Sequence, residues 1–212
     1  MAKTSDKITD GIPSTLTLDF ASEWAKKRVT EKRYKHIAGV AKVARNLAKQ
    51  ANVDAHAAEL ASWLHDACKE MNDTELVKEA KALGMKLTPL EEKNGHLLHG
   101  PVAALILQKE FGLTNQAILD AISEHTLGAV NMTDLSKVVF LADCLEPSRS
   151  KGYTDPIWKA LNADQEIDLD KAILQACELG LQHVIDSGRV IHPRTIEVRD
   201  HYLEKVQRKQ TK

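Results

Sequence analysis

The stretch DAHAAELASWLHDACK, residues 54–69, is the part of the sequence that decides the fold. Ala58, Ala61 and His65 follow one another at intervals of three or four residues, so they share one face of a helix. A face of small apolar residues packs inward, and it carries His65 and the adjacent Asp66 toward a core. An unpaired buried carboxylate is very costly, so Asp66 has to be paired, protonated or bound to a metal ion.

Four more residues of the same chemical types lie on inward helix faces elsewhere in the chain. His36 is in line with Val40, Val43 and Leu47, His99 is in line with Val102, Ala103 and Ile106, His125 follows Ile118, Ala121 and Ile122, and Asp143 follows Val139 and Phe140. As an isolated dipeptide, His65-Asp66 is better explained as a structural hydrogen-bonded pair. Two carboxylates and four imidazoles aimed into one core favour a metal site instead.

The remaining sequence has helical periodicity, and no alternating strand pattern competes with it. We therefore expect an all-α fold, a helical bundle. The expected helices are 15–28, 31–50, 54–67, 73–83, 100–111, 114–125, 134–145, a short one around 156–161, 168–188 and 193–208. Expected helix starts are Asp54, Asp73, Thr114, Asp168 and Pro193, and expected stops are Gly84, Gly112 and Gly188.

Length and composition indicate a single domain whose partner is a small molecule. The 212 residues are 43% hydrophobic, enough for one core, which we expect over residues 15–208 between a flexible tail at 1–14 and a short tail at 209–212. A formal net charge of −1 argues against a nucleic-acid partner, and no apolar run is long enough for a membrane helix. Three widely spaced cysteines favour a reducing compartment, so we expect a cytoplasmic protein.

The ligand-type residues stand in a series of short motifs, and the series is far more specific than the His-Asp pair alone. The motifs are Arg33-Tyr34-Lys35-His36, Trp63-Leu64-His65-Asp66-Ala67-Cys68-Lys69, His99-Gly100-Pro101-Val102, His125-Thr126-Leu127-Gly128 and Leu141-Ala142-Asp143. Further matching details are Asn131-Met132, Leu145-Glu146-Pro147-Ser148-Arg149 and the run GRVIHPRTIE at 188–197. Over residues 30–202 the chain resembles the HD-domain metal-dependent phosphohydrolases. Within them it resembles the bacterial YqeK family, symmetrical dinucleoside tetraphosphatases that split diadenosine tetraphosphate into two molecules of ADP.

This resemblance implies a dinuclear metal site, with iron the metal usually associated with the family. It assigns His36, His65, Asp66 and Asp143 to one ion, and Asp66, as a bridge, with His99 and His125 to a second. Mixed imidazole and carboxylate ligands suit iron, manganese, zinc or nickel better than calcium or magnesium. Two such ions supply hydroxide at neutral pH for attack on a phosphoric anhydride, so Asp66 becomes a catalytic residue as well as a ligand.

The residues expected to contact the phosphates are mainly basic. Lys69 matches the family's pattern after the His-Asp pair and is the candidate for neutralising the charge on the leaving ADP. His192, just before Pro193, is expected either to cap a helix or to reach the phosphates. The other candidates for substrate contact are Arg33, Thr126, Gly128, Arg149 and Arg194.

Other functions remain compatible with the sequence. The ligand series defines the chemistry better than the base, so another HD-type nucleotide phosphohydrolase, such as a nucleoside monophosphate phosphatase or a guanosine-alarmone hydrolase, is the alternative enzyme. The alternative from another class is a non-catalytic module that senses a nucleotide or docks onto a partner enzyme. Such a module could also keep the metal ions and use them only to stabilise its structure. A homodimer is also possible.

Overall fold

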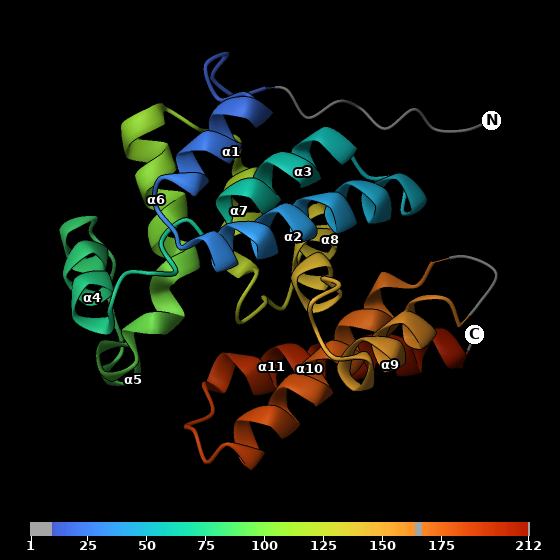
Figure 1. Ribbon diagram of the computed structural model, residues 1–212. Helices are drawn as coiled ribbons and strands as arrows, with labels where there is room; N and C mark the ends of the chain where they lie inside the picture. Colours follow the sequence, from blue (N-terminus) through green and yellow to red (C-terminus); the bar gives the residue numbers. More distant parts are fainter. Residues whose placement is uncertain (1–9, 164–166, 212) are drawn as a thin grey trace.

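In the computed structural model, which describes residues 10–163 and 167–211, the described chain is helical and contains no strand (Figure 1). This confirms the predicted all-α fold. The helices are α1 (Leu18–Lys26), α2 (Glu31–Gln50), α3 (Ala55–Leu64), α4 (Asp73–Ala82), α5 (Pro89–Lys93), the 3-10 helix η1 (Gly95–Leu98), α6 (His99–Phe111), α7 (Gln116–Glu124), α8 (Asp134–Cys144), α9 (Lys151–Leu161), α10 (Leu169–Asp186) and α11 (Pro193–Gln210).

Several helix ends are set by the capping residues that the sequence indicates. The Asp54 carboxylate accepts hydrogen bonds from the first backbone N–H groups of α3, and Asp168 does the same for α10. Two expected starts are wrong by one residue, because Asn72 rather than Asp73 caps α4 and Asn115 rather than Thr114 caps α7. In both cases the asparagine carbonyl oxygen lies where it accepts from the N–H group three residues on.

Several expected helices are shorter in the structure, such as 15–28, which forms as Leu18–Lys26, and 54–67, which forms as Ala55–Leu64, and two further regions differ in more than their helix ends. The expected helices leave residues 84–99 unassigned, yet this segment forms α5, which starts at Pro89 and has a capping box, and η1. The helix expected at 156–161 begins already at Lys151, so Pro156 lies inside α9. Proline removes only one backbone hydrogen bond there, while the buried Thr154, Ile157 and Leu161 hold the helix on the core.

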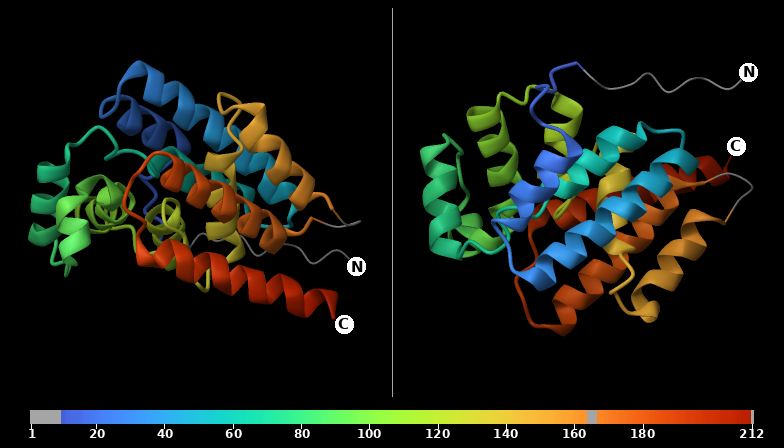
Figure 2. Two further views of the ribbon diagram at one scale, coloured as in Figure 1. Left: turned by 90° about the horizontal axis from the view of Figure 1, so that it is seen from below. Right: turned by 45° about the horizontal axis from the view of Figure 1, so that its top comes forward.

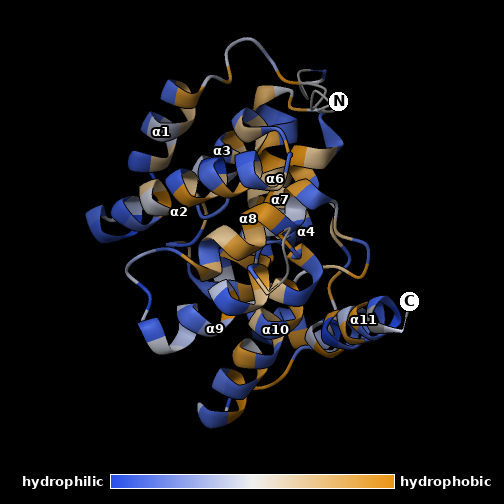
Figure 3. Ribbon diagram, turned by 90° about the vertical axis from the view of Figure 1, so that its right-hand side faces the viewer, coloured by the Kyte–Doolittle hydropathy of each residue, from blue (hydrophilic) through white to orange (hydrophobic). Residues whose placement is uncertain are grey.

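The core helices lie in two groups that meet at α8. Helix α8 packs against α2, α3 and α7 on one side and against α10 on the other, and α10 contacts α9 and α11 (Figures 1 and 2). Hydrophobic residues concentrate where α6, α7 and α8 come together, as Figure 3 shows. Helix α8 therefore lies between the helices that carry the histidines and the C-terminal helices.

The described parts of both chain ends contact the helical domain. The Gly11 carbonyl accepts hydrogen bonds from the backbone N–H groups of Thr114 and Asn115, before α7, and α11 continues to residue 210, with Lys209 paired to Asp168 and Asp170. The greater part of the expected N-terminal tail, residues 1–9, lies outside the described residues. No helix in the described part of the chain combines the length and hydrophobicity needed to cross a membrane.

Candidate metal centre

The six ligand-type residues singled out in the sequence meet in one place. They come from five parts of the fold: His36 from α2, His65 and Asp66 from the end of α3, His99 from the start of α6, His125 from the end of α7 and Asp143 from the last turn of α8. His65 and His99 are fully buried, and Asp66 and His125 are almost so. His65 and His125 were expected inside their helices, but each is the C-cap residue, one position past the helix end.

Three of the histidines are oriented by the same local contact. The Nδ1 of His65 lies 2.6 Å from the Ser62 carbonyl oxygen, and that of His125 lies 2.7 Å from the Ile122 carbonyl oxygen. His99 repeats the pattern with the carbonyl oxygen three residues before it, at 2.5 Å. A carbonyl only accepts, so each Nδ1 carries the hydrogen and each neutral ring presents the lone pair of Nε2.

The Nε2 atoms point to a common centre. The Nε2 atoms of His99 and His125 are 2.9 Å apart, and the buried Nε2 of His65 has no hydrogen-bond partner among the described residues. Burial lowers the pKa of both His65 and His99 to about 4, although the charge of Asp66 acts in the opposite direction. At neutral pH these rings are therefore neutral, and facing lone pairs need a cation between them.

His36 is oriented by a carboxylate instead of a carbonyl. Its Nδ1 donates to Glu146 Oε2 at 3.1 Å, which leaves Nε2 facing Asp143 Oδ1 at 3.0 Å. Burial would lower the pKa of His36, but the hydrogen bonds to Asp143 and Glu146 and the charges of Asp143 and Asp66 outweigh it and raise that pKa. A proton or a metal ion between Nε2 and Oδ1 satisfies both atoms.

Asp66 lies between the two sets of histidines. Its Oδ1 is 3.2 Å from His99 Nε2 and 3.5 Å from His125 Nε2, while Oδ2 is 3.6 Å from His65 Nε2 and 3.9 Å from His36 Nε2. Burial raises the pKa of this carboxyl, and any surrounding histidine that carries a proton on Nε2 lowers it. Each oxygen thus faces its own group of imidazoles, as in a carboxylate that bridges two ions.

The donor set therefore fits metal ions. Two groups of three ligand atoms share Asp66, namely His36, His65 and Asp66, and Asp66, His99 and His125. Neutral imidazoles with fixed tautomers and an ionised carboxylate are the ligand forms that metal binding requires. Asp143, 3.0 Å from His36, completes the first group.

Glu146 takes part in this site, although the sequence analysis gave it no role. Its side chain is almost fully buried, bonds to His36 and to the Ser148 hydroxyl, and lies against Gly39 of α2. A Cβ atom at Gly39 would be 2.5 Å from Glu146 Oε1, so only glycine leaves room for this carboxylate. Glu146 stands in a motif already quoted from the sequence, but only the packing of α2 against the segment after α8 shows its contact with His36.

A second glycine lets the His99 and His125 rings approach each other. A Cβ atom at Gly100 would lie 2.8 Å from the Ile122 carbonyl oxygen and 3.0 Å from the His125 ring. The absence of a side chain at Gly100 therefore allows the start of α6 to pack directly on the end of α7. In the His99-Gly100 motif, His99 supplies a ligand, and Gly100 leaves the space that the His125 ring needs.

A cavity of about 280 Å³ opens from the ligands toward α10 and α11. Of the residues expected to contact phosphate, Arg33, Lys69, Thr126 and Arg149 line it. Lys69 Nζ lies 3.3 Å from His99 Nε2, and burial lowers the pKa of this lysine. These four side chains are therefore next to the metal ligands.

Both arginines also pair with a ligand carboxylate. Arg33 donates to Asp66 Oδ2 at 3.0 Å, and Arg149 donates to Asp143 Oδ1 at 2.6 Å and to its backbone carbonyl at 3.1 Å. Each arginine therefore binds the same carboxylate oxygen that faces His36.

The other expected substrate contacts lie outside the lining of this cavity. Gly128, with a positive φ of 69°, packs next to Val198 of α11. His192 caps α11 by accepting from the Arg194 backbone N–H, and its Nε2 is 3.7 Å from Glu91. The Arg194 side chain is exposed, and Thr195, which was not singled out, is the α11 residue at the cavity.

Comparison with known proteins agrees with this arrangement. Residues 33–148 match the family described as HD domain. The symmetrical bis(5'-nucleosyl)-tetraphosphatase of Bacillus subtilis is 34% identical over 170 residues, which cover 80% of this chain and 89% of the relative. The enzyme of the same name from Staphylococcus aureus is 32% identical, with coverage of 88% and 95%. A crystal structure described as that of a predicted HD superfamily hydrolase involved in NAD metabolism, from Clostridium acetobutylicum, has a TM-score of 0.82 at 33% identity, and the match covers 89% of this chain and 98% of that one.

The chain belongs to the HD-domain family, whose hydrolases are metal-dependent. Within this family it belongs to the group that contains the Bacillus subtilis and Staphylococcus aureus relatives. The family likeness inferred from the motifs is thereby confirmed.

Proposed function

We propose that this protein hydrolyses dinucleoside tetraphosphates symmetrically, so that diadenosine tetraphosphate yields two molecules of ADP. The observation that carries the proposal is the pair of ligand groups that share Asp66, directly beside a cavity with basic side chains. Two relatives that match most of this chain are named for that reaction. Water adds to one of the two central phosphorus atoms, and the bridging oxygen leaves with the other ADP.

We further propose that the six residues hold two transition-metal ions, with iron the expected metal and manganese, zinc or nickel compatible with the same ligands. His36, His65 and Asp143 would hold one ion, His99 and His125 the other, and Asp66 both. When bound, such ions lower the pKa of a water molecule and neutralise phosphate oxygens.

The chain's own side chains would bind and orient the tetraphosphate. Lys69, at the wall of the cavity beside His99, is placed to neutralise negative charge that develops on the leaving diphosphate. The Thr126 hydroxyl lies 3.1 Å from His99 Nε2 and 3.0 Å from His125 Nε2, and can donate to a phosphate oxygen held there. Arg33 and Arg149 hold the ligand carboxylates and add positive charge at the cavity.

Product analysis tests the reaction. Protein purified without added metal would be assayed for its metal content and then incubated with diadenosine tetraphosphate, with products separated by chromatography. ADP as the only product supports the proposal, whereas ATP together with AMP would contradict symmetrical cleavage. Turnover confined to nucleoside monophosphates or to a guanosine alarmone would favour the other HD-type activities.

The substitution Asp66→Ala separates catalytic from purely structural metal ions. We expect a folded protein that has lost metal and turnover, because the helices around the site share a large apolar core that does not include Asp66. Circular dichroism and urea unfolding give the folded fraction. Global unfolding of the variant would show that the ions serve the fold.

A further inference from the structure

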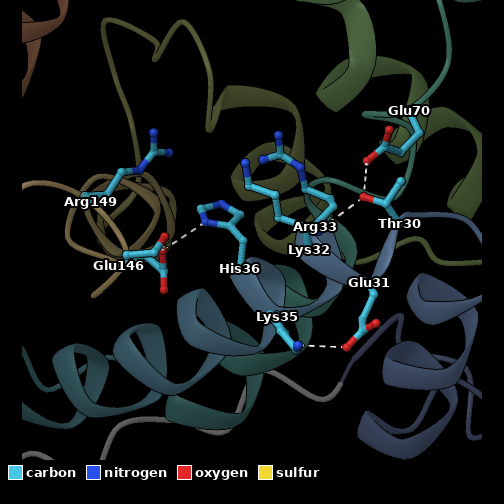
Figure 4. A pocket seen from close by; sticks show the side chains of 10 residues that line it. Thr30, Glu31, Lys32, Arg33, Lys35, His36, Glu70, Glu146 and Arg149 are labelled. Carbon is cyan, nitrogen blue, oxygen red and sulfur yellow. Dashed lines mark hydrogen bonds and ion pairs between the residues drawn. The ribbon is translucent and has the colours of Figure 1, made fainter.

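A second and larger cleft adjoins the metal centre on the side of α2. Its volume is about 810 Å³, and it is lined by the first turns of α2 and by the segment after α8, including His36, Glu146 and Ser148 (Figure 4). Arg33 and Arg149 line both this cleft, here called the α2 cleft, and the 280 Å³ cavity. The two spaces therefore reach the metal ligands from different sides and share these two arginines.

The volumes of the two spaces suggest that each one binds one half of a dinucleotide. Sites for drug-sized molecules have volumes of roughly 300–1,000 Å³. The cavity toward α10, at about 280 Å³, is at the lower limit and suits one half of a dinucleoside tetraphosphate. Cleavage in the middle of the molecule requires the two halves to extend in different directions from the metal centre, and the α2 cleft is the adjoining space of sufficient volume.

The charges in the α2 cleft are suited to phosphate. Glu31 pairs with Lys35 at 2.7 Å, and Glu70 accepts a hydrogen bond from the Thr30 hydroxyl, so these two carboxylates have partners of their own. Lys32 takes part in no ion pair among the described residues. In Figure 4 the side chains of Lys32, Arg33 and Arg149 extend into the same space near His36, while Lys35 points away to Glu31.

The residues that line the α2 cleft also indicate that it does not select among nucleotide bases. Among the residues that the structure describes, no aromatic residue other than His36 lines it, so these residues offer no aromatic platform for a purine or pyrimidine base. Recognition there depends on charge and on hydrogen bonds to phosphate and sugar. The nature of the second base is therefore of little importance.

We propose that the α2 cleft is the binding site for the second nucleoside diphosphate half of the substrate, with Lys32 as a specificity residue that contacts its phosphates. This proposal rests on the symmetrical hydrolysis proposed above. It predicts that the metal-loaded protein binds two ADP molecules per chain, one in each space, and that diadenosine and adenosine–uridine tetraphosphates with the same adenosine half are cleaved at similar rates.

The test uses Lys32→Glu, with Lys42→Glu as the matched control because Lys42 is an exposed lysine of the same helix outside both spaces. ADP is titrated into each metal-loaded protein by calorimetry. We expect two ADP per chain for wild type and for Lys42→Glu, and a loss of about 10-fold to 100-fold in the affinity of one ADP only in Lys32→Glu. The KM for diadenosine tetraphosphate should rise in parallel, with kcat little changed.

Two outcomes would overturn the proposal. One is a single ADP per chain in wild type, and the other is an unchanged second ADP affinity in Lys32→Glu that has a native circular dichroism spectrum. Either can occur while wild type still forms ADP alone from diadenosine tetraphosphate, so the proposed reaction would stand. If wild type fails to form ADP from that substrate, the proposed function fails independently of the ADP titration.

Discussion

Removal of Glu146 should weaken metal binding without removing a ligand. The residue is 5% exposed, and its Oε2 accepts from His36 Nδ1 at 3.1 Å. Glu146→Ala leaves this N–H buried without a partner and lets the ring rotate. A hydrogen bond to a charged group contributes about 1.5–3 kcal/mol, which corresponds to about 10-fold to 100-fold in affinity, the range typical of residues that orient metal ligands.

The assay is a manganese titration of metal-free protein, followed by calorimetry, on wild type, Glu146→Ala and Glu146→Gln. Glutamine keeps an acceptor and loses the charge, so its affinity should fall between the other two. Glu110→Gln is the control, because Glu110 is exposed near the end of α6 and lies outside the metal centre. A folded Glu146→Ala protein that binds manganese within twofold of wild type would refute the role given to this carboxylate.

The other predictions concern packing and acid stability. Gly100→Ala should destabilise the fold by about 1–3 kcal/mol in urea unfolding, because the new Cβ would be 2.8 Å from the Ile122 carbonyl oxygen and 3.0 Å from the His125 ring; an unchanged midpoint would contradict this. Asp170 pairs with Lys137 at 3.0 Å, and although burial acts in the opposite direction, its lysine partners lower its pKa to about 2. Because this pKa is lower in the folded than in the unfolded chain, the stabilisation of about 2 kcal/mol is complete above pH 4 and is lost as the pH falls toward 2. Asp170→Asn should therefore show less loss of stability than wild type between pH 5 and pH 2.5, and identical losses would argue against the ion pairs as the cause.

The helices and the meeting of the six ligand-type residues could be predicted because the signals are local. A stripe of apolar residues defines the inward face, and a ligand on that face has to approach the core. Asp54 and Asp168 cap helices as expected for the same reason, since capping involves only the next few residues. The short α5 was missed because five residues provide too little periodicity to detect.

The contacts that position the ligands could not be predicted, because they depend on how distant segments pack. Glu146 reaches His36 across 110 positions, and Gly39 matters only because this carboxylate lies against it. Lys32 and Arg33 are adjacent in sequence, yet only Arg33 lines both spaces. Sequence periodicity indicates which face of a helix points inward, but it does not indicate which distant residues contact that face.

The contact of His65, His99 and His125 with the carbonyl three residues earlier separates two properties of the metal centre. Each imidazole plane is set by one turn of its own backbone, whereas the spacing between the rings depends on how whole helices dock. Substitutions at remote helix–helix contacts can therefore adjust the distance between the two groups of ligand atoms, and with it the preference among metals, while every ligand keeps its own orientation. Evolution or protein engineering could thus retune this centre from outside its coordination sphere.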